Sequence, residues 1–400
     1  MRLLFVADGR SPTSRSWISH WLASGHDVLL VSTHACDPLP GLAGLHVLPV
    51  ALGSLSGRQA GRSAPLWRRS LRRLALPARY LLGPLGLWYY QRRFTALVRA
   101  FQPDLVHALR IPFEGMLAAS TPAGIPLLVS IWGNDLTLHA QASGVMKSLT
   151  RITLERADAL LADAQRDIRL GRQLGFAAGR PTLVIPGAGG IRRELLDDRS
   201  PVPMPAELPE APLVVNPRGQ RPGSLRQDVF FRSIPGILAR LPEVQFLCPA
   251  LQDDPEALHW IETLGIRRST HLWPQLAQRQ LWAVYRKAQV YVSPSIHDGT
   301  PNSLLEAMAC GCFPVVGRIE SMQEWIRHGE NGLLVDASSP QALADAIVTA
   351  LKDPGLREQA RKENARLIAE RAEYGHCMAM AEAFYLGMLA GGKDSPPAAA

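Results

Sequence analysis

The stretch that decides the fold is residues 293–317, SPSIHDGTPNSLLEAMACGCFPVVG. An apolar strand ends near Ser295, a loop carries Asp298-Gly299-Thr300-Pro301, and a helix begins near Asn302. Gly311 ends this helix, and a second apolar strand follows it. A strand, a helix and a second strand in this order predict two neighbouring strands of a parallel sheet joined by a right-handed crossover.

The start of this helix has the chemistry of an anion site. The backbone N–H groups of Asn302, Ser303 and Leu304 have no partner within a regular helix, and the helix dipole adds a partial positive charge. Gly299 lets the backbone approach a ligand closely, and Pro301 suits the first turn. We therefore expect a diphosphate to bind at this helix end.

Two carboxylates flank the expected diphosphate. Asp298 precedes the helix, where it can reach the hydroxyls of a sugar attached to the diphosphate. Glu306 lies one turn inside, where it can accept hydrogen bonds from vicinal hydroxyls such as those of a ribose. An aspartate in a turn and a glutamate on a helix are each common alone, so the hypothesis depends on both occurring in this frame. Together they suit a nucleotide sugar.

Outward from this stretch, the chain reads as two series of alternating strands and helices. Its 400 residues exceed one ordinary core, and 47% hydrophobic with 20% charged residues is a normal globular balance. Proline is dense over 197–212, which predicts a linker. We expect strands at 3–8, 27–33, 103–109, 126–132, 158–163 and 182–187 before the linker, and at 213–217, 244–250, 271–273, 289–295, 312–317 and 331–336 after it. We expect helices at 14–24, 227–241, 255–264, 277–287, 302–310, 320–328, 340–352 and 355–391.

These series predict an α/β protein with two doubly wound Rossmann-like domains facing a central cleft, where substrates of such proteins bind. The expected N-terminal domain is 1–196, the linker 197–212, and the C-terminal domain 213–375. A helix at 376–391 is expected to pack back on the N-terminal domain, and the tail 392–400 to be disordered.

The C-terminal block resembles a known family. The spacing of Asp298 and Glu306 resembles the E-x7-E signature of the retaining GT-B glycosyltransferases of family 4, the glycosyl transferases group 1, with Asp298 in the first acidic position. FPVVG (313–317), Glu324 and GENGLLV (329–335) resemble the rest of that block. MRLLFVADGRSPTSRSW, PDLVHA and IPGAGG resemble N-terminal elements of the family, so the resemblance covers the whole chain.

The resemblance implies roles in the C-terminal domain. Asp298 would bind the transferred sugar, Glu306 the donor ribose, and the backbone of Gly299, Thr300, Pro301, Asn302, Ser303 and Leu304 the diphosphate. The family uses an Arg and a Lys to neutralise the leaving group. Arg218 stands at the Arg position; the Lys is missing, and Arg226 or Arg221 would replace it with a planar fork in place of a point donor. Trp273 would border the base, and neither metal nor cofactor is expected.

In the N-terminal domain the resemblance implies an acceptor site. Gly9 lies where the family backbone approaches the donor phosphate, although turn geometry alone also explains it. IWGND (131–135) resembles the family's H-G-S-D element, with Trp132 at the usual His position. Asp135 is a catalytic candidate or a helix N-cap. His107 is a cleft candidate or a core histidine.

The expected reaction is sugar transfer with retention of anomeric configuration, to a lipid-linked or polysaccharide acceptor. No carboxylate obviously fits a covalent double displacement. Arg218 and Arg226 would stabilise the leaving diphosphate, and closure of the two domains about the linker would exclude water. Two alternatives stay open: a nucleotide-sugar epimerase of similar fold, and a non-catalytic nucleotide-binding protein at a membrane surface.

A basic segment marks the first half of the chain. No acidic residue lies between Asp37 and Asp104, and WRRSLRRLAL (67–76) places Arg68, Arg69, Arg72 and Arg73 beside an apolar stripe. The pattern is typical of a helix on an anionic membrane; an acidic acceptor or a solvated helix also explains it. No nucleic-acid motif accompanies the net charge of +8. No transmembrane helix or secretion signal is seen, so we expect a cytoplasmic protein, peripheral on the inner membrane face, of undetermined oligomeric state.

Overall fold

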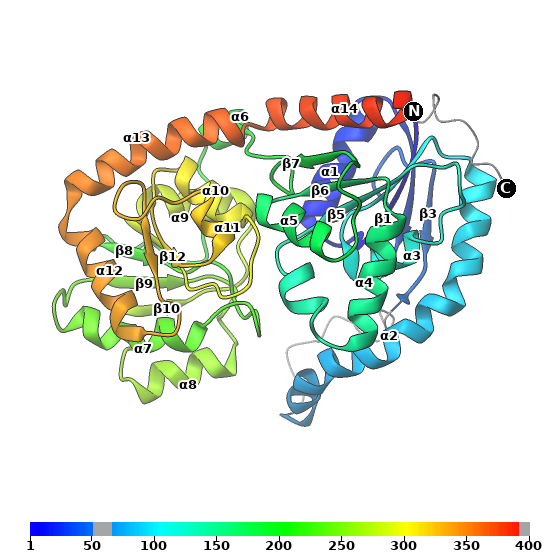
Figure 1. Cartoon of the computed structure of the whole chain (residues 1–400). Coiled ribbons are helices and arrows are strands. Elements are labelled where there is room, and N and C mark those ends of the chain that lie inside the picture. The colour runs from blue at the N-terminus through cyan, green and yellow to red at the C-terminus, as the bar shows by residue number, and fades with distance from the viewer. Residues whose placement is uncertain (51–65, 392–400) are drawn as a thin grey trace. The chain divides into compact units, whose positions relative to one another are not determined.

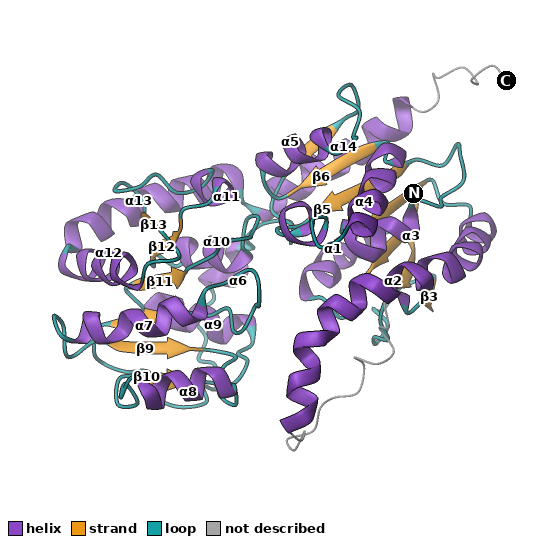
Figure 2. Ribbon diagram, turned by 60° about the horizontal axis from the view of Figure 1, so that its bottom comes forward, coloured by secondary structure: helices purple, strands orange, loops and turns teal. Residues whose placement is uncertain are grey.

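The computed structural model describes residues 1–50 and 66–391, without the side chains of 66–79, 81, 82 and 391 (Figure 1). The chain forms two compact units. Unit 1 holds Met1–Gly189 and the chain from Met378 onward, and unit 2 holds Gly190–Cys377. Each unit is a parallel sheet between helices (Figure 2). The doubly wound α/β prediction is confirmed.

Unit 1 contains a seven-stranded parallel sheet in the order β3-β2-β1-β4-β5-β6-β7. The strands are β1 Arg2–Ala7, β2 Asp27–Ser32, β3 Gly44–Val47, β4 Leu105–Ala108, β5 Leu127–Ile131, β6 Ala159–Ala162 and β7 Thr182–Val184. The order reverses at β1, which pairs with both β2 and β4. The carboxyl ends of β1 and β4 are therefore adjacent at the switch point, where ligands of such sheets bind.

The helical segments assigned to unit 1 follow these strands. They are α1 Pro12–Ala23, α2 Leu66–Phe101, η2 Ile111–Gly115, α3 Met116–Ala118, η3 Asp135–His139, α4 Gly144–Arg156, α5 Gln165–Gln173 and most of α14, Tyr374–Gly391. Ser11 caps α1 and Ser143 caps α4, each through its side-chain oxygen.

Unit 2 contains a six-stranded parallel sheet in the order β10-β9-β8-β11-β12-β13. The strands are β8 Leu213–Val215, β9 Gln245–Cys248, β10 Thr270–Leu272, β11 Val290–Ser293, β12 Phe313–Gly317 and β13 Leu333–Val335. The helices are α6 Arg193–Asp197, α7 Gln227–Leu238, α8 Pro255–Thr263, α9 Gln278–Lys287, α10 Asn302–Ala309, α11 Glu320–Gln323, α12 Pro340–Lys352 and α13 Pro354–Arg371.

Alternate residues of the unit 2 strands enter two separate cores. Tyr291 and Val316 pack with α9, α10 and α13, whereas Val292 and Val315 pack with α7, α8 and α12. This follows from the period of two in a strand, which sends successive side chains to opposite faces. Because both faces are covered, the strands read as continuous apolar runs, which is why the sequence pattern located them.

Helix α14 completes the core of unit 1. Tyr385 is buried and stacks on Trp21 with ring centroids 4.1 Å apart. Its hydroxyl accepts a hydrogen bond of 3.1 Å from the Trp17 indole and lies 2.5 Å from Nδ1 of His107. The far C-terminal helix is thus part of the N-terminal unit's interior.

The predicted linker belongs to unit 2. Met204 and Leu208 pack against its core, and Asp198 pairs with Arg279 of α9 at 2.5 Å. Dense proline prevents regular helix and strand here but does not prevent packing. The chain instead changes unit at Gly189–Gly190 and at Cys377–Met378.

Three further elements differ from the sequence expectations. Strand β3 was not predicted, because its four residues are all only partly buried. The helix expected at 320–328 ends at Gln323. The helix expected at 355–391 divides into α13 and α14, because Ile191 N–H donates to the Ala372 carbonyl at 2.7 Å and interrupts the helical pattern there.

None of the helices within the described residues is long and apolar enough to span a membrane.

Candidate active site

The loop between β11 and α10 is where the sequence places the diphosphate. Pro301 is the N-cap residue of α10 and offers no side-chain hydrogen bond. The N–H of Leu304 donates to the Pro301 carbonyl at 2.9 Å, so the expectation that this N–H is open to a ligand is wrong. The tight first turn of α10 brings the Leu304 N–H to the Pro301 carbonyl. The N–H groups of Asn302 and Ser303 remain the predicted ligands of the diphosphate.

The loop is fixed from behind by side chains of unit 2. The Trp325 indole donates to the hydroxyl of buried Thr300 at 2.8 Å, so Thr300 holds the loop from inside. The hydroxyls of Ser303 and Tyr291 lie 3.0 Å apart. A Cβ on Gly317 would collide with the backbone carbonyl of Ser295, so β12 passes this loop at a distance that only glycine allows.

Asp298 and Arg218 meet in the structure. Their side chains form an ion pair and are only 13% and 9% exposed. Ser295 Oγ lies 3.3 Å from the Asp298 carboxylate, and Ser321 Oγ donates to the Asp298 carbonyl at 2.7 Å. Burial opposes the charge of Arg218, but the neighbouring Asp298 carboxylate outweighs it and raises the Arg218 pKa. The residues expected to hold sugar and leaving group thus contact one another directly.

Glu306 is a buried acid on α10. Its side chain is 7% exposed, and Gln278 Nε2 donates to its Oε1 at 2.7 Å. Burial raises the pKa of Glu306 to about 7, and the hydrogen bond from Gln278 opposes this rise only in part. Glu306 therefore changes charge near neutral pH. Ionisable groups with strongly shifted pKa values cluster at functional sites, and Glu306 lies on the helix where the diphosphate is expected.

Arg226 has a different partner from Arg218. Its guanidinium forms two hydrogen bonds of 2.8 Å with Asp228, and this contact raises the Arg226 pKa. Its backbone N–H donates to the Pro294 carbonyl at 3.1 Å, which brings the residue beside the end of β11. A leaving group would have to compete with Asp228 for this arginine.

Trp273 already uses its backbone inside unit 2. Its N–H donates to Cys248 at 3.1 Å, and its carbonyl accepts from Leu251 and Gln252. The side chain is 7% exposed. Both backbone groups of Trp273 are thus occupied within unit 2, and its place beside the base stays a prediction.

In unit 1, His107 is a core residue. It is 1% exposed, and Nε2 lies 2.8 Å from Ser130 Oγ while Nδ1 faces Tyr385. Burial lowers the His107 pKa to about 3, so the ring is neutral at physiological pH. The expectation that His107 is a cleft residue is wrong. Although His107 lies near the end of β4, its side chain packs against Trp17 of α1 and Tyr385 of α14.

Asp135 is fully buried and acts as an anchor. Its carboxylate pairs with Arg110 at 2.6 Å and accepts the backbone N–H groups of Ile111, at 3.1 Å, and Trp132, at 3.2 Å. It caps no helix through its side chain, since Asn134 holds the N-cap position of η3. The N-cap expectation for Asp135 is therefore wrong, and its catalytic role stays a prediction. The observed contacts show that Asp135 positions Arg110 and the turn after β4.

Gly9 and Trp132 are also placed by contacts within unit 1. The N–H of Gly9 donates to Ser32 Oγ at 3.1 Å, and a Cβ at this position would collide with Cys36 Sγ. Trp132 is partly buried, and its indole lies next to Gly187. A larger residue at position 9 would have to displace the Cys36 thiol, so packing as well as turn geometry favours glycine here.

Sequence reasoning missed a polar cluster at the switch point of unit 1. Arg110 is 28% exposed, so part of it reaches solvent beside its buried partner Asp135. Glu114 is buried and accepts from Thr33 Oγ1 at 2.7 Å. Tyr80 Oη lies 2.6 Å from His139 Nδ1. The position of Arg110 directly after a buried strand was the available signal.

Among the residues whose placement is described, no group of three or more His, Cys, Asp and Glu is arranged to hold a metal ion.

Comparisons with known proteins bear on both units. The family model of the glycosyl transferases group 1 matches residues 252–367, and that of the glycosyl transferase 4-like domain matches residues 9–187. The chain belongs to the group 1 glycosyltransferases. The first match lies in unit 2 and includes Asp298 and Glu306; the second lies in unit 1.

The matched relatives of this chain include bacterial proteins. A D-inositol 3-phosphate glycosyltransferase of Corynebacterium glutamicum is 34% identical over 99 residues, which are 25% of this chain and 24% of the relative. A D-inositol 3-phosphate glycosyltransferase 1 of Catenulispora acidiphila is 26% identical over 312 residues, 73% and 74% of the two chains. In the first relatives matched, the chain spans about a quarter of the relative's length.

Solved structures share the fold. Sucrose-phosphate synthase from Thermosynechococcus elongatus superposes with a TM-score of 0.70 at 19% identity, covering 98% of this chain and 99% of that one. Anabaena Alr3699/HepE in complex with UDP gives 0.68 at 16% identity, covering 96% and 99%. At these identities the likeness establishes the two-domain GT-B fold of this chain.

Proposed function

We propose that this protein is a retaining glycosyltransferase that takes a sugar from a nucleoside-diphosphate donor bound to unit 2, without a metal. One observation carries the proposal: the Asp298–Arg218 ion pair and the buried Glu306 flank the start of α10. Family membership supports transferase activity, and Alr3699/HepE, a protein of the same fold, has been solved with UDP and with UDP-glucose.

Donor binding would exchange partners around Arg218. The diphosphate, at the N–H groups of Asn302 and Ser303, competes with Asp298 for the guanidinium, which forms strong charge-assisted bonds to phosphate. Asp298, released from this pair, then accepts hydrogen bonds from the sugar hydroxyls. The Asp298–Arg218 pair would therefore keep both groups oriented until the donor arrives.

The chemical step follows from these positions. The bond from the anomeric carbon to the diphosphate oxygen breaks, and its electron pair leaves with the diphosphate. Arg218 and the helix end stabilise the charge that develops on the leaving group. The acceptor hydroxyl attacks from the face that the diphosphate leaves, and its proton passes to a phosphate oxygen. Retention results because the new bond forms on the same face as the old one.

Glu306 would hold the donor ribose through its carboxylate. Its pKa of about 7 means that a fraction of the free protein carries a neutral Glu306 at neutral pH. Two ribose hydroxyls donating to the carboxylate favour the charged form. Donor binding should therefore release a fraction of a proton near pH 7.

The proposal is tested with donors first and acceptors second. A thermal-shift screen against UDP-, GDP- and ADP-sugars identifies the donor. Arg218→Ala and Glu306→Ala should each remove measurable turnover while circular dichroism stays unchanged. Arg240→Ala, which removes an exposed arginine paired with Asp345, is the matched control. Near-normal turnover of both site variants would refute the assignment.

Separate experiments test the acceptor and the stereochemistry of transfer. Inositol 3-phosphate and phosphatidylinositol are the first acceptors to try, because relatives bear the names D-inositol 3-phosphate glycosyltransferase and phosphatidyl-myo-inositol mannosyltransferase. Proton NMR of the product reports the anomeric configuration, and turnover in excess EDTA should match that without it. Donor incubated alone should give no epimer; an epimer would favour the epimerase alternative.

We also propose that α2 rests on an anionic membrane surface. Leu85, Trp88 and Tyr89 lie on one face at helical spacing and are 68%, 75% and 70% exposed. Arg92 and Arg93 follow in the next turn and are exposed. Tryptophan and tyrosine next to arginine suit the headgroup region. The side chains of Arg68, Arg69, Arg72 and Arg73, named in the sequence analysis, lie outside the described residues.

Vesicle co-sedimentation tests this surface. With anionic phosphatidylglycerol vesicles, the pelleted fraction should fall for Trp88→Ser with Tyr89→Ser and should fall with added salt. Leu386→Ser, which removes an exposed leucine of α14, is the matched control and should pellet like the wild type. Equal pelleting of all three proteins would contradict membrane binding through α2.

A further inference from the structure

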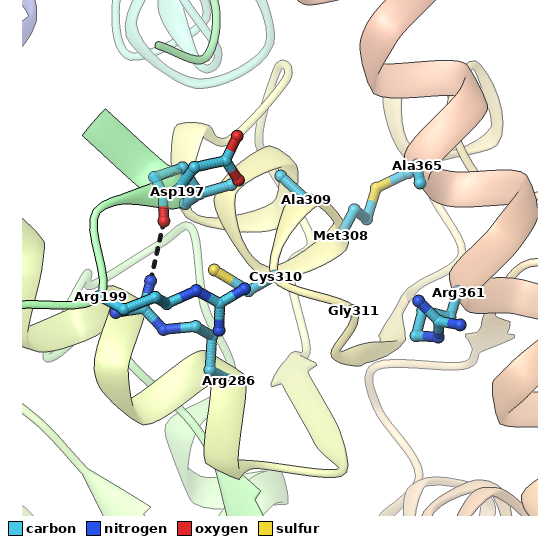
Figure 3. A pocket seen from close by; sticks show the side chains of 10 residues that line it. Asp197, Arg199, Arg286, Met308, Ala309, Cys310, Gly311, Arg361 and Ala365 are labelled. Carbon is cyan, nitrogen blue, oxygen red and sulfur yellow. Dashed lines mark hydrogen bonds between the residues drawn. The ribbon is translucent and has the colours of Figure 1, made fainter. Parts of the chain in front are cut away.

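A pocket lies in unit 2 at the end of α10 opposite to the donor site. Its volume is about 210 Å³, which leaves room for a phosphate-sized anion with several waters. Its lining comes from four segments: Arg199 after α6, Arg286 on α9, the Cys310-Gly311 turn after α10, and Arg361 on α13 (Figure 3). Ala309, the last residue of α10, lies seven positions after Asn302, or about 10 Å along the helix.

Positive charge dominates the lining. Three arginines face one acid, Asp197. Arg361 is already bound to Glu358 by two hydrogen bonds of 2.7 Å. Arg286 donates to the Leu196 carbonyl at 2.9 Å. Within the described part of the chain, no ion pair joins Arg199 or Arg286 to a carboxylate.

Arg199 and Arg286 both line the pocket, and both contribute electrostatically at the Cys310 thiol (Figure 3). Burial raises the pKa of Cys310 to about 12, although both arginines act to lower it. The thiol is therefore neutral at physiological pH and does not balance their charge. Two neighbouring guanidinium groups without an anionic partner repel one another, and a bound anion would remove that cost.

We propose that this pocket binds a phosphate group, held by Arg199 and Arg286, at a site separate from the donor site. Guanidinium groups match the geometry of phosphate oxygens through paired N–H donors. The carboxyl end of α10 carries a partial negative charge that disfavours anions, so the arginines are what makes the site suitable. The inference goes beyond the proposed transfer reaction, which does not use these residues.

A bound phosphate would join two parts of unit 2. Arg199 belongs to the segment after α6 that the sequence predicts as a linker, and Arg286 belongs to α9. Contact of both with one anion would hold that segment on α9. The ligand would thus stabilise unit 2 by mass action.

Isothermal titration of the full chain with inorganic phosphate tests the site. Arg286→Ala and Arg199→Ala should each weaken binding by roughly tenfold or more, the effect of losing a hydrogen bond to a charged group. Arg286→Lys keeps the charge and should bind with intermediate affinity. Arg267→Ala removes an exposed arginine paired with Glu262 and should bind phosphate like the wild type.

A second arm separates this pocket from the donor site, which also attracts phosphate. Arg218→Ala should retain phosphate binding at the pocket, with the remaining affinity abolished by adding Arg286→Ala. A sugar phosphate monoester in place of phosphate tells whether an ester binds more tightly than the free ion. Binding unchanged in Arg199→Ala and Arg286→Ala, or no binding to the wild type at about 10 mM phosphate, would overturn the proposal.

Discussion

Replacing Glu306 by glutamine should change how the stability of unit 2 depends on pH. Glutamine keeps the size of the side chain and can still accept the hydrogen bond from Gln278, but it carries no titrating proton. The pKa of Glu306 is about 7 in the folded chain, against 4.5 for an ordinary glutamate. Because the folded state holds this proton more tightly than the unfolded state, stability falls as the pH rises through this window.

The size of the effect follows from the two pKa values. A difference of 2.5 pKa units, at about 1.36 kcal/mol for each, gives about 3 kcal/mol between about pH 4.5 and about pH 8. Most of this loss falls between about pH 5 and about pH 7. The Glu306→Gln variant does not lose this stability as the pH rises. Its stability relative to the wild type should therefore increase by about 3 kcal/mol across the same pH range.

Hydrogen exchange measured by mass spectrometry is the suitable assay, because a chain of two units has no single unfolding midpoint. The strands of unit 2 report its free energy of opening at each pH. Glu207→Gln, at an exposed glutamate, controls for the loss of a carboxylate and should show no such trend. A wild type and a Glu306→Gln variant that run parallel over the whole range would refute the assignment of a buried, raised pKa.

Three further substitutions test packing described above. Asp135→Asn should lower the free energy of opening of unit 1 by about 3 kcal/mol in hydrogen exchange, because partly exposed Arg110 loses its buried partner; a loss below about 1 kcal/mol would contradict the anchor role. Gly317→Ala should cost about 1–3 kcal/mol and weaken donor binding, because the new methyl group displaces the loop after β11, so unchanged donor affinity would count against that contact. Tyr385→Phe should lower the free energy of opening of unit 1 by about 1–3 kcal/mol in hydrogen exchange, because buried His107 loses a partner; unchanged exchange of the unit 1 strands would argue against this network.

The fold was accessible from sequence because its signals are local. The helix expected near Asn302 begins at Asn302, and the runs around Val290 and Phe313 are strands that pair in parallel. Buried parallel strands need continuous apolar residues, so pattern alone locates them. The segment at 197–212 shows the limit of this approach, because proline content predicts irregular backbone but says nothing of what the segment packs against.

The site was accessible only in outline. Asp298 and Glu306 were proposed from their spacing, but the contact of Asp298 with Arg218 joins residues 80 positions apart and depends on sheet order. The same holds for Asp135, whose burial is decided by the turn after β4. His107 could not be assigned from sequence, because a strand-end histidine faces either solvent or a neighbouring helix, and here the partner comes from α14.

The insertion of unit 2 within unit 1 has a consequence for synthesis on the ribosome. The residues of unit 1 up to Gly189 emerge first, yet Tyr385, which covers Trp17 and Trp21, emerges 196 residues after Gly189. At about 5–20 residues per second this is a delay of roughly 10–40 s. Throughout that interval Trp17 and Trp21 of the nascent chain lack their cover from Tyr385. Release of the polypeptide before α14 is made would therefore leave an incompletely folded, aggregation-prone product.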